Sequence, residues 1–105
     1  MQKVAEGKPY TLIFLLAGST PAADAATMQD LQLRHLAYLF TLQEEGRLSV
    51  FGPILQHERL KGIIICNSTD ASEIKAWMDG DPYIAGGYLA YEMHSFFTIP
   101  GQVVT

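Results

Sequence analysis

The sequence predicts an α+β fold, a ferredoxin-like antiparallel sheet with two helices on one face. Three observations support it. Apolar segments follow one another in the order strand, helix, strand, strand, helix, strand. The chain has 105 residues, enough for one domain with a core, and 49% of them are hydrophobic. We therefore expect one domain over residues 1–105, in which 1–9 and 99–105 are terminal tails.

The first half of the chain is defined by its hydrophobic spacing. Residues 10–17 are apolar on both alternating faces and predict the first strand. Apolar side chains then recur at helical spacing and predict a helix over 27–45 that ends near Gly46. Residues 47–51 predict the second strand, which we expect Gly52-Pro53 to close as a turn.

In the second half of the chain, a strand, a helix and a last strand are predicted after a charged loop. Residues 60–66 predict the third strand. Asp70 followed by Glu73 has the form of a helix start, with a capping acceptor and a glutamate three residues later. Pro82 cannot continue that helix, and residues 88–97 predict the last strand.

Two of the predicted strands are apolar on both faces. Residues 12–16 and 63–65 are consecutive apolar runs, whereas a sheet with one face in water alternates apolar and polar residues. The helices cover one face, and no further segment is left to cover the other. We therefore expect a homodimer formed through the open sheet face, which can assemble further.

Composition excludes several classes of function. The formal net charge is −4 and there is no run of Lys or Arg, so we expect no nucleic-acid partner. No apolar run is long enough for a membrane span. Cys66 is the single cysteine, which excludes an internal disulfide or a cysteine-based metal site and fits a reducing cytoplasm. The alternative is secretion, because the basic N-terminus and the apolar run 11–17 imitate a signal peptide.

His35 and Asp81 are the candidate catalytic residues. His35 shares the apolar stripe of the first helix, where a histidine is either satisfied by one hydrogen bond or acts as an acid or base at a cleft. Asp81 is fixed by Pro82 at a helix end, where it either caps the backbone or orients another group. If the two meet, the carboxylate fixes the tautomer of the imidazole, as general acid–base catalysis requires.

Other polar residues are candidates for substrate binding. His94 and Glu92 are two apart on the last strand, so we expect them on one face with Tyr88, towards the space between subunits. Two ligands do not make a metal site, and we expect neither a metal nor a cofactor. The expected pocket residues are Tyr10, Gly52, Pro53, Tyr83 and His94.

Several short motifs together resemble the YCII-related (YciI-like) family. They are residues 33–39, 45–48 with 51–53, 60–63, 81–83 with 85–87, and 91–94, and the resemblance spans about residues 10–98. It implies a dimeric α+β barrel in which His35 and Asp81, carried over by motif, form an active-site pair. One characterised branch of the family removes chloride from a chlorinated hydroxyhydroquinone.

The chain also departs from the family pattern at positions expected in pocket walls. Ser95-Phe96-Phe97 replaces a Pro-Trp pair, and the loop 56–59 lacks the usual Gly and Asp residues. The substrate is therefore not carried over. We expect a small cofactor-free enzyme of lyase or isomerase type acting on an oxygenated or aromatic molecule. The alternatives are a non-catalytic protein that binds a small molecule in the same dimeric cleft and, by analogy of fold alone, a cofactor-free monooxygenase.

Overall fold

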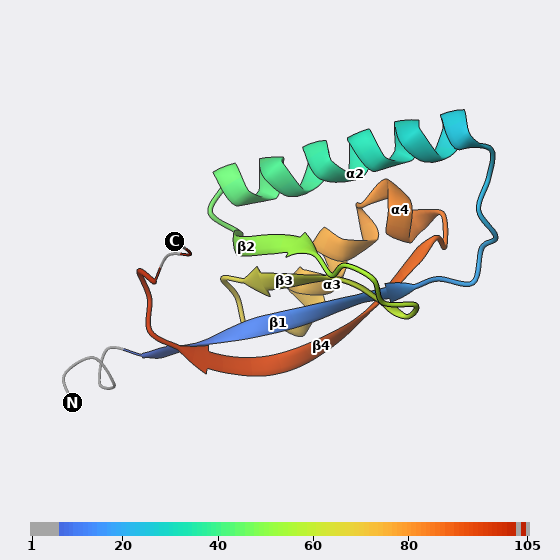
Figure 1. The fold of residues 1–105 in the computed structure, drawn as a ribbon. Coiled ribbons are helices and arrows are strands. Elements are labelled where there is room, and N and C mark those ends of the chain that lie inside the picture. Colours follow the sequence, from blue (N-terminus) through green and yellow to red (C-terminus); the bar gives the residue numbers. More distant parts are fainter. Residues whose placement is uncertain (1–6, 103, 105) are drawn as a thin grey trace.

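A computed structural model describes residues 7–102 and 104 and has a four-stranded antiparallel sheet with helices on one side (Figure 1). The strands are β1 (Lys8–Ala17), β2 (Leu48–Pro53), β3 (Leu60–Cys66) and β4 (Leu89–Thr98), in the order β2-β3-β1-β4. The helices are α2 (Ala25–Glu44), α3 (Ala71–Asp79) and the short α4 (Pro82–Ala85). This is the predicted α+β ferredoxin-like fold.

The boundaries differ from the predicted ones by a few residues. The third strand matches, and α2 begins and ends slightly earlier than expected. Gly52 and Pro53 lie within β2, paired with Ile63 and Gly62 of β3, so they do not form the turn we predicted. Helix α4 was not predicted, because four residues are too few to show helical periodicity.

The core lies between the sheet and the helices. Ile13 and Ile64 are fully buried and paired across β1 and β3, on the face where α2 and α3 also place their apolar side chains. The buried core cluster consists of Ile13, Leu15, Leu39, Leu42, Leu48, Ile64, Cys66, Ile74, Trp77 and Met78. Tyr91 and Met93 of β4 pack against this cluster.

The other face of the sheet carries the alternate side chains of the same strands. Leu12 and Phe14 are paired with Ile65 and Ile63, and all four are only partly buried. None of the three helices covers this face, because strand alternation sends these side chains away from the core. The consecutive apolar runs in β1 and β3 are thus explained by two apolar sheet faces.

The N-terminal part of the chain supplies a central strand. The apolar run that imitates a signal peptide forms most of β1, which is paired with β3 on one side and β4 on the other. Residues 1–6, which complete that imitation, lie outside the described residues. Among the helices of the described part, none is long and apolar enough to cross a membrane.

Candidate active site

Asp81 lies at the junction of two helices. Helix α3 ends at Asp79 with Gly80 as its C-cap, and the Asp81 N–H donates to the Met78 carbonyl at 3.1 Å. Asp81 is then the N-cap of α4, where its Oδ1 accepts the Tyr83 N–H at 2.9 Å. Pro82 suits the first position of a helix because that position needs no N–H donor. The junction leaves the Asp81 side chain with no exposed surface.

His35 reaches this carboxylate from α2. Its side chain is buried on the inner stripe of the helix, 7% exposed, and its Nδ1 lies 2.5 Å from Asp81 Oδ2. A carboxylate only accepts hydrogen bonds, so the proton of a neutral imidazole is placed on Nδ1. Nε2 then carries the free lone pair and is the atom that can take or return a proton.

The Nε2 atom is open to the interior of a cavity. His35 is among the residues that line the cavity, and its only hydrogen bond to a described residue is the one from Nδ1. Within the described part of the chain, no fully buried side-chain nitrogen or oxygen lacks a partner. Nε2 therefore keeps contact with the cavity, where a substrate can reach it.

Tyr38 holds the Asp81 junction against α2. It lies on α2 three residues after His35, and its hydroxyl donates to the Trp77 carbonyl at 2.7 Å. Burial, followed by the nearby Asp81 carboxylate, raises the pKa of the Tyr38 phenol, which therefore stays a neutral donor at physiological pH. Gly80 passes so close that a Cβ there would lie 2.3 Å from the Tyr38 hydroxyl oxygen.

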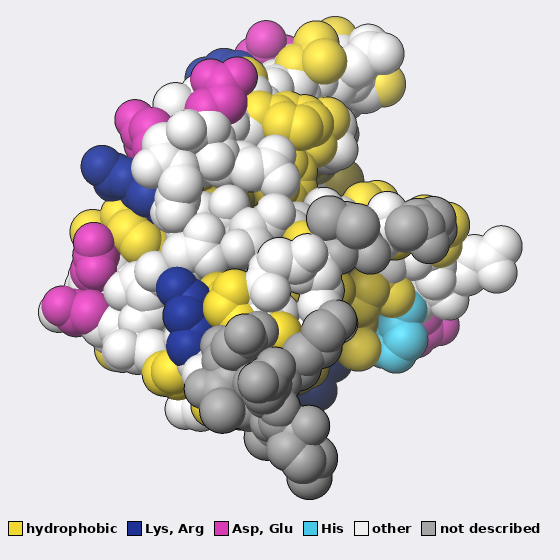
Figure 2. Space-filling view, turned by 90° about the vertical axis from the view of Figure 1, so that its left-hand side faces the viewer, with side chains coloured by type: hydrophobic (Ala, Val, Ile, Leu, Met, Phe, Trp, Pro, Cys, Tyr) yellow, Lys and Arg dark blue, Asp and Glu magenta, His cyan; other side chains and the backbone are white. Residues whose placement is uncertain are grey.

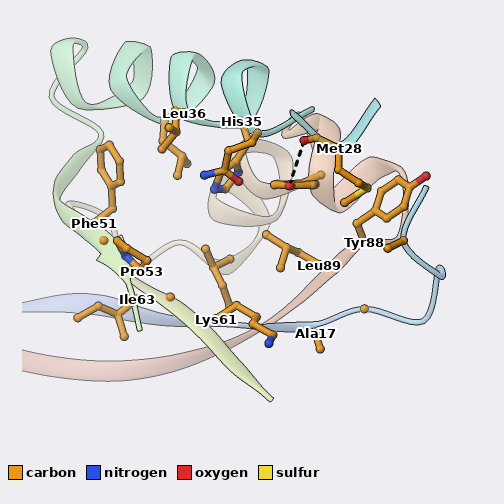
Figure 3. A pocket seen from close by; sticks show the side chains of 18 of the residues that line it. Ala17, Met28, His35, Leu36, Phe51, Pro53, Lys61, Ile63, Tyr88 and Leu89 are labelled. Carbon is orange, nitrogen blue, oxygen red and sulfur yellow. Dashed lines mark hydrogen bonds between the residues drawn. The ribbon is translucent and has the colours of Figure 1, made fainter. Parts of the chain in front are cut away.

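The cavity has a volume of about 740 Å³ and lies between α2 and the strands. Figure 2 shows a hollow beneath the upper lobe that carries α2, with hydrophobic side chains on its wall. Figure 3 shows His35 and Leu36 on the helix side and Lys61 and Leu89 on the strand side. The lining residues are mostly apolar, with few polar groups, which is typical of a small-molecule site.

Tyr83 connects the His35–Asp81 pair with the cavity wall. Its ring centroid lies 5.1 Å from that of His35, and its hydroxyl is 3.5 Å from the Met28 carbonyl oxygen, a long hydrogen bond. Burial and then the Asp81 carboxylate raise the pKa of Tyr83, which keeps its phenol protonated. A neutral O–H in the cavity can donate to an oxygen of a bound molecule.

Not all of the predicted pocket residues lie together. Gly52, Pro53 and Tyr83 line the cavity with His35. Tyr10 and His94 do not, because strand alternation places both on the opposite face of the sheet. Tyr88, which we expected on that opposite face, precedes β4 and lines the cavity instead, so that expectation was wrong.

Sequence reasoning missed some polar residues of the cavity, among them Gln32, Lys61 and Thr20. Gln32 precedes His35 by three positions, a spacing that puts both on one face of a helix and could have identified it. Nothing in the local pattern identifies Lys61 or Thr20. They join the site through the pairing of β3 with β1 and through a bond from the Thr20 hydroxyl to the Gly86 carbonyl.

Neither a metal cluster nor a reactive thiol accompanies this pair. The described residues contain no group of three His, Cys, Asp or Glu side chains that could hold a metal ion. Cys66 is fully buried in the core, and burial raises the pKa of its thiol to about 12. The chemistry available to the described site is thus that of His35, oriented by Asp81, with Tyr83 beside it.

The fold and this buried pair define a ferredoxin-like α+β protein with a His–Asp pair at a cavity. A model of the YCII-related domain matches residues 11–96. The chain therefore belongs to the YCII-related family, as its motifs indicated. A comparison with curated protein sequences gives no match.

Two solved structures show the same fold. One is 5-chloro-2-hydroxyhydroquinone dehydrochlorinase (TftG) from Burkholderia phenoliruptrix AC1100 in complex with 2,5-dihydroxybenzoquinone, with a TM-score of 0.55 and 21% identity, covering 81% of this chain and 90% of that one. The other is muconolactone isomerase, with a TM-score of 0.68 and 14% identity, covering 91% and 96%. Both likenesses show that this chain shares the ferredoxin-like α+β fold with these proteins.

Proposed function

We propose that the protein is a cofactor-free enzyme of lyase or isomerase type, in which His35 moves a proton and Asp81 orients it. One observation carries this proposal: Nδ1 of His35 is 2.5 Å from a buried carboxylate, while the opposite edge of the ring faces a cavity. A histidine with one nitrogen fixed and the other accessible can act as a general base and then as a general acid.

The proposed mechanism uses both oxygens of Asp81. Oδ1 is held by the Tyr83 N–H, so the carboxylate cannot rotate freely, and Oδ2 accepts the Nδ1 proton. When Nε2 takes a proton from a substrate, the imidazolium forms next to a negative charge that stabilises it. The same proton is then returned to another atom of the substrate or to the leaving group. General acid–base catalysis of this kind contributes about 10²- to 10⁴-fold to a rate.

The cavity supports a small oxygenated or aromatic substrate. Its volume of about 740 Å³ fits one small organic molecule, and Phe40, Phe51 and Tyr88 can pack against a ring. The structural neighbours support the same class by their names, which refer to a chlorinated hydroxyhydroquinone and to muconolactone. Their low identities leave the particular substrate to experiment.

We also propose that the protein is a cytoplasmic homodimer formed through the open sheet face. The partly exposed side chains of Leu12, Phe14, Ile63 and Ile65 support this, because an isolated chain would leave them in water. Val50 on the edge strand β2 is exposed and extends the same apolar surface. The oligomeric state can be measured by sedimentation equilibrium.

A non-catalytic binding protein is the second candidate. It is favoured by the mostly apolar lining of the cavity and by the limited exposure of His35, which leaves little of the ring in contact with the cavity. Such a protein would bind the same small molecules without turning them over. Binding with and without turnover therefore separates the two candidates.

The test follows two reactions in wild-type protein, His35→Ala and Asp81→Asn. The probes are 5-chloro-2-hydroxyhydroquinone, followed by chloride release, and muconolactone, followed by its isomerisation. We expect the His35 variant to lose about 10²- to 10⁴-fold in kcat. Asp81→Asn can no longer enforce the Nδ1–H tautomer and should also lose activity.

The matched control is His94→Gln on the opposite sheet face, which should leave kcat unchanged. An unchanged kcat in His35→Ala would contradict the proposed role of His35. If the wild-type protein binds both probes and converts neither, the non-catalytic candidate is favoured instead.

A further inference from the structure

A base that takes a proton from a carbon atom leaves an electron pair on the substrate. In the proposed cofactor-free enzyme that pair is stabilised by moving onto an oxygen of the substrate. In a mostly apolar cavity a negatively charged oxygen is unstable unless a hydrogen-bond donor faces it. The donors in the lining therefore decide which reaction His35 can start. Besides His35, the lining side chains that can donate are those of Thr20, Gln32, Lys61, Tyr83 and Tyr88.

Two of these donors are bound to other parts of the protein. The Thr20 hydroxyl donates to the Gly86 carbonyl at 2.8 Å. The Lys61 side chain is exposed, and its Nζ donates at 3.0 Å to the carbonyl of His57, which is not among the lining residues. The ammonium group is therefore held outside the cavity.

Gln32 and Tyr88 are less suitable donors for a substrate next to His35. Gln32 is exposed, so water competes for its amide group. Figure 3 shows the Tyr88 hydroxyl at the end of the ring that points away from His35. Tyr83 is the remaining donor of this set.

The Tyr83 hydroxyl is only weakly bound within the protein. Its ring centroid lies 5.1 Å from that of His35, and its hydroxyl donates to the Met28 carbonyl over 3.5 Å, the bond that the dashed line at Met28 marks in Figure 3. This distance is long, since O–H···O bonds are usually about 2.7–2.8 Å. The Met28 carbonyl lies in the first turn of α2 and also accepts a helical N–H. The hydroxyl can therefore turn to a substrate oxygen without leaving that carbonyl unpaired.

Tyr83 is held in place by the same carboxylate that orients His35. Its backbone N–H donates to Asp81 Oδ1 at 2.9 Å, while Asp81 Oδ2 accepts from His35 Nδ1. Its carbonyl accepts the Tyr88 N–H at 3.0 Å. Burial, followed by Asp81, raises the pKa of Tyr83, so the phenol keeps the proton that it donates. The positions of the base and of the donor are therefore coupled through Asp81.

We infer that Tyr83 is a second catalytic residue, whose hydroxyl donates to a carbonyl oxygen of the substrate while His35 takes a proton from the carbon next to that carbonyl. This inference rests on the proposed function, because it assigns a partner for the substrate oxygen in the same proton transfer. It narrows the substrate class to ketones, lactones and the keto forms of hydroxylated rings, with a C–H beside the carbonyl.

The step is balanced without a further reactant. Nε2 of His35 takes the proton, the C–H electrons form a C=C bond to the carbonyl carbon, and the π electrons of the C=O bond move to the oxygen, where Tyr83 stabilises them. Return of the proton from His35 to a different carbon of a conjugated enolate restores the carbonyl and gives an isomer. Where the next carbon carries a leaving group, the carbonyl is restored, a C=C bond forms, and the leaving group departs with its electron pair.

The experiment compares the binding of two rings of nearly equal shape. At neutral pH 2,3,5,6-tetrafluorophenol is an anion whose oxygen accepts hydrogen bonds, whereas 2,3,5,6-tetrafluoroaniline is neutral and its amino group donates them. Dissociation constants are measured by fluorine NMR titration for the wild-type protein, Tyr83→Phe and Tyr88→Phe. Tyr91→Phe is the matched control, because the Tyr91 hydroxyl is bound to Asp79 Oδ1 at 3.3 Å and does not line the cavity.

We expect Tyr83→Phe to weaken binding of the phenolate about tenfold and to leave binding of the aniline unchanged, because a hydrogen bond to a charged acceptor is lost. Tyr91→Phe should bind both probes as the wild-type protein does. Three results would each overturn the inference: no binding of the phenolate by the wild-type protein, an equal change for both probes in Tyr83→Phe, or a loss of phenolate binding in Tyr88→Phe alone.

The kinetic readout is the isomerisation of muconolactone, which has a lactone carbonyl. Tyr83→Phe should lower kcat about 10²- to 10³-fold and change KM much less, because the hydrogen bond is strongest when the oxygen is charged. An unchanged kcat would also overturn the inference. The binding measurement needs no turnover. Absence of turnover in the wild-type protein would therefore count against the proposed function, and phenolate binding would still decide the role of Tyr83.

Discussion

The described part of the chain has two histidine–carboxylate pairs that differ in almost every physical respect. His35 and Asp81 come from different helices and meet at 2.5 Å, with both side chains almost completely buried. His94 and Glu92 belong to the same strand, lie 3.7 Å apart, and are 46% and 42% exposed at their side chains. Both pairs were visible in the sequence as candidates.

The difference lies in what surrounds each carboxylate. The second oxygen of Asp81 accepts the Tyr83 N–H, and water is kept away, so the carboxylate can hold an imidazole in one orientation. Around Glu92 and His94 water screens the charges, and two unit charges 4 Å apart in water attract by only about 1 kcal/mol. The His94 ring rests near Phe14, with centroids 4.9 Å apart, and faces away from the cavity. The His35–Asp81 pair is a candidate catalytic dyad because its two side chains come from different helices and meet in a buried place. The residue types alone, which the other pair also has, are not enough.

The largest expected effect is on stability when one carboxylate is removed. Asp81→Ala should lower the free energy of unfolding by about 3–5 kcal/mol, because it leaves His35 buried without its partner and removes the cap of α4. Glu92→Ala should cost less than about 0.5 kcal/mol, as expected for an exposed pair. Urea unfolding at one protein concentration measures both.

Asp81→Asn serves as the control for capping. An asparagine oxygen can still accept the Tyr83 N–H, so this variant isolates the lost charge from the lost cap. It should be more stable than Asp81→Ala. Equal costs for Asp81→Ala and Glu92→Ala would contradict the contrast between the two pairs.

A smaller effect is expected from filling the space beside the Asp81 junction. In Gly80→Ala the new methyl group would lie 2.3 Å from the Tyr38 hydroxyl oxygen and should cost about 1–3 kcal/mol. The backbone of Gly80 has φ −80°, which alanine adopts without strain, so the cost comes from the clash alone. Because Asp81 is the next residue, the same variant should also lower the activity assigned to His35.

A double-mutant cycle with Tyr38→Phe tests whether the cost of Gly80→Ala comes from the clash with the Tyr38 hydroxyl. Removing the hydroxyl costs about 1 kcal/mol through the lost bond to the Trp77 carbonyl and also relieves the closest contact with the new methyl group. Gly80→Ala should therefore cost less in the Tyr38→Phe background than in the wild-type protein. Additive costs would show that the two sites do not interact.

The sequence predicted the fold and the positions of His35 and Asp81 because these depend on strong local signals. Helical periodicity revealed the inner stripe with His35, and Pro82 marked the position of Asp81. A 46-residue separation between the two gives no sign of contact, and the family motifs supplied that expectation. The structure brings the two side chains together at the junction of α3 and α4.

The cavity wall was predicted less well because it depends on strand register and loop path. Tyr10 and His94 were assigned by residue type, but alternation along β1 and β4 turns them to the other face. Lys61 is among the lining residues through its position in β3 beside β1, which no periodic pattern along the chain encodes. Tyr88 was misplaced because β4 begins one residue later than predicted.

The smallest expected effect on stability is at Tyr83, in the wall of the cavity, and it contrasts with the large effect expected at the His35–Asp81 pair. Tyr83→Phe keeps the backbone N–H that Asp81 accepts and loses only a 3.5 Å bond to the Met28 carbonyl, so unfolding at pH 7 should change by less than about 0.5 kcal/mol. The folded-state pKa of the Tyr83 phenol is raised by burial and by Asp81, so its contribution to stability is complete below the unfolded value of about 10. This contribution is lost as the pH rises from about 10 through the folded-state pKa. In that range the free energy of unfolding of the wild-type protein should fall relative to that of Tyr83→Phe. Urea unfolding at neutral and alkaline pH measures this shift, and a difference that stays constant with pH would show that the phenol is not held neutral beside Asp81.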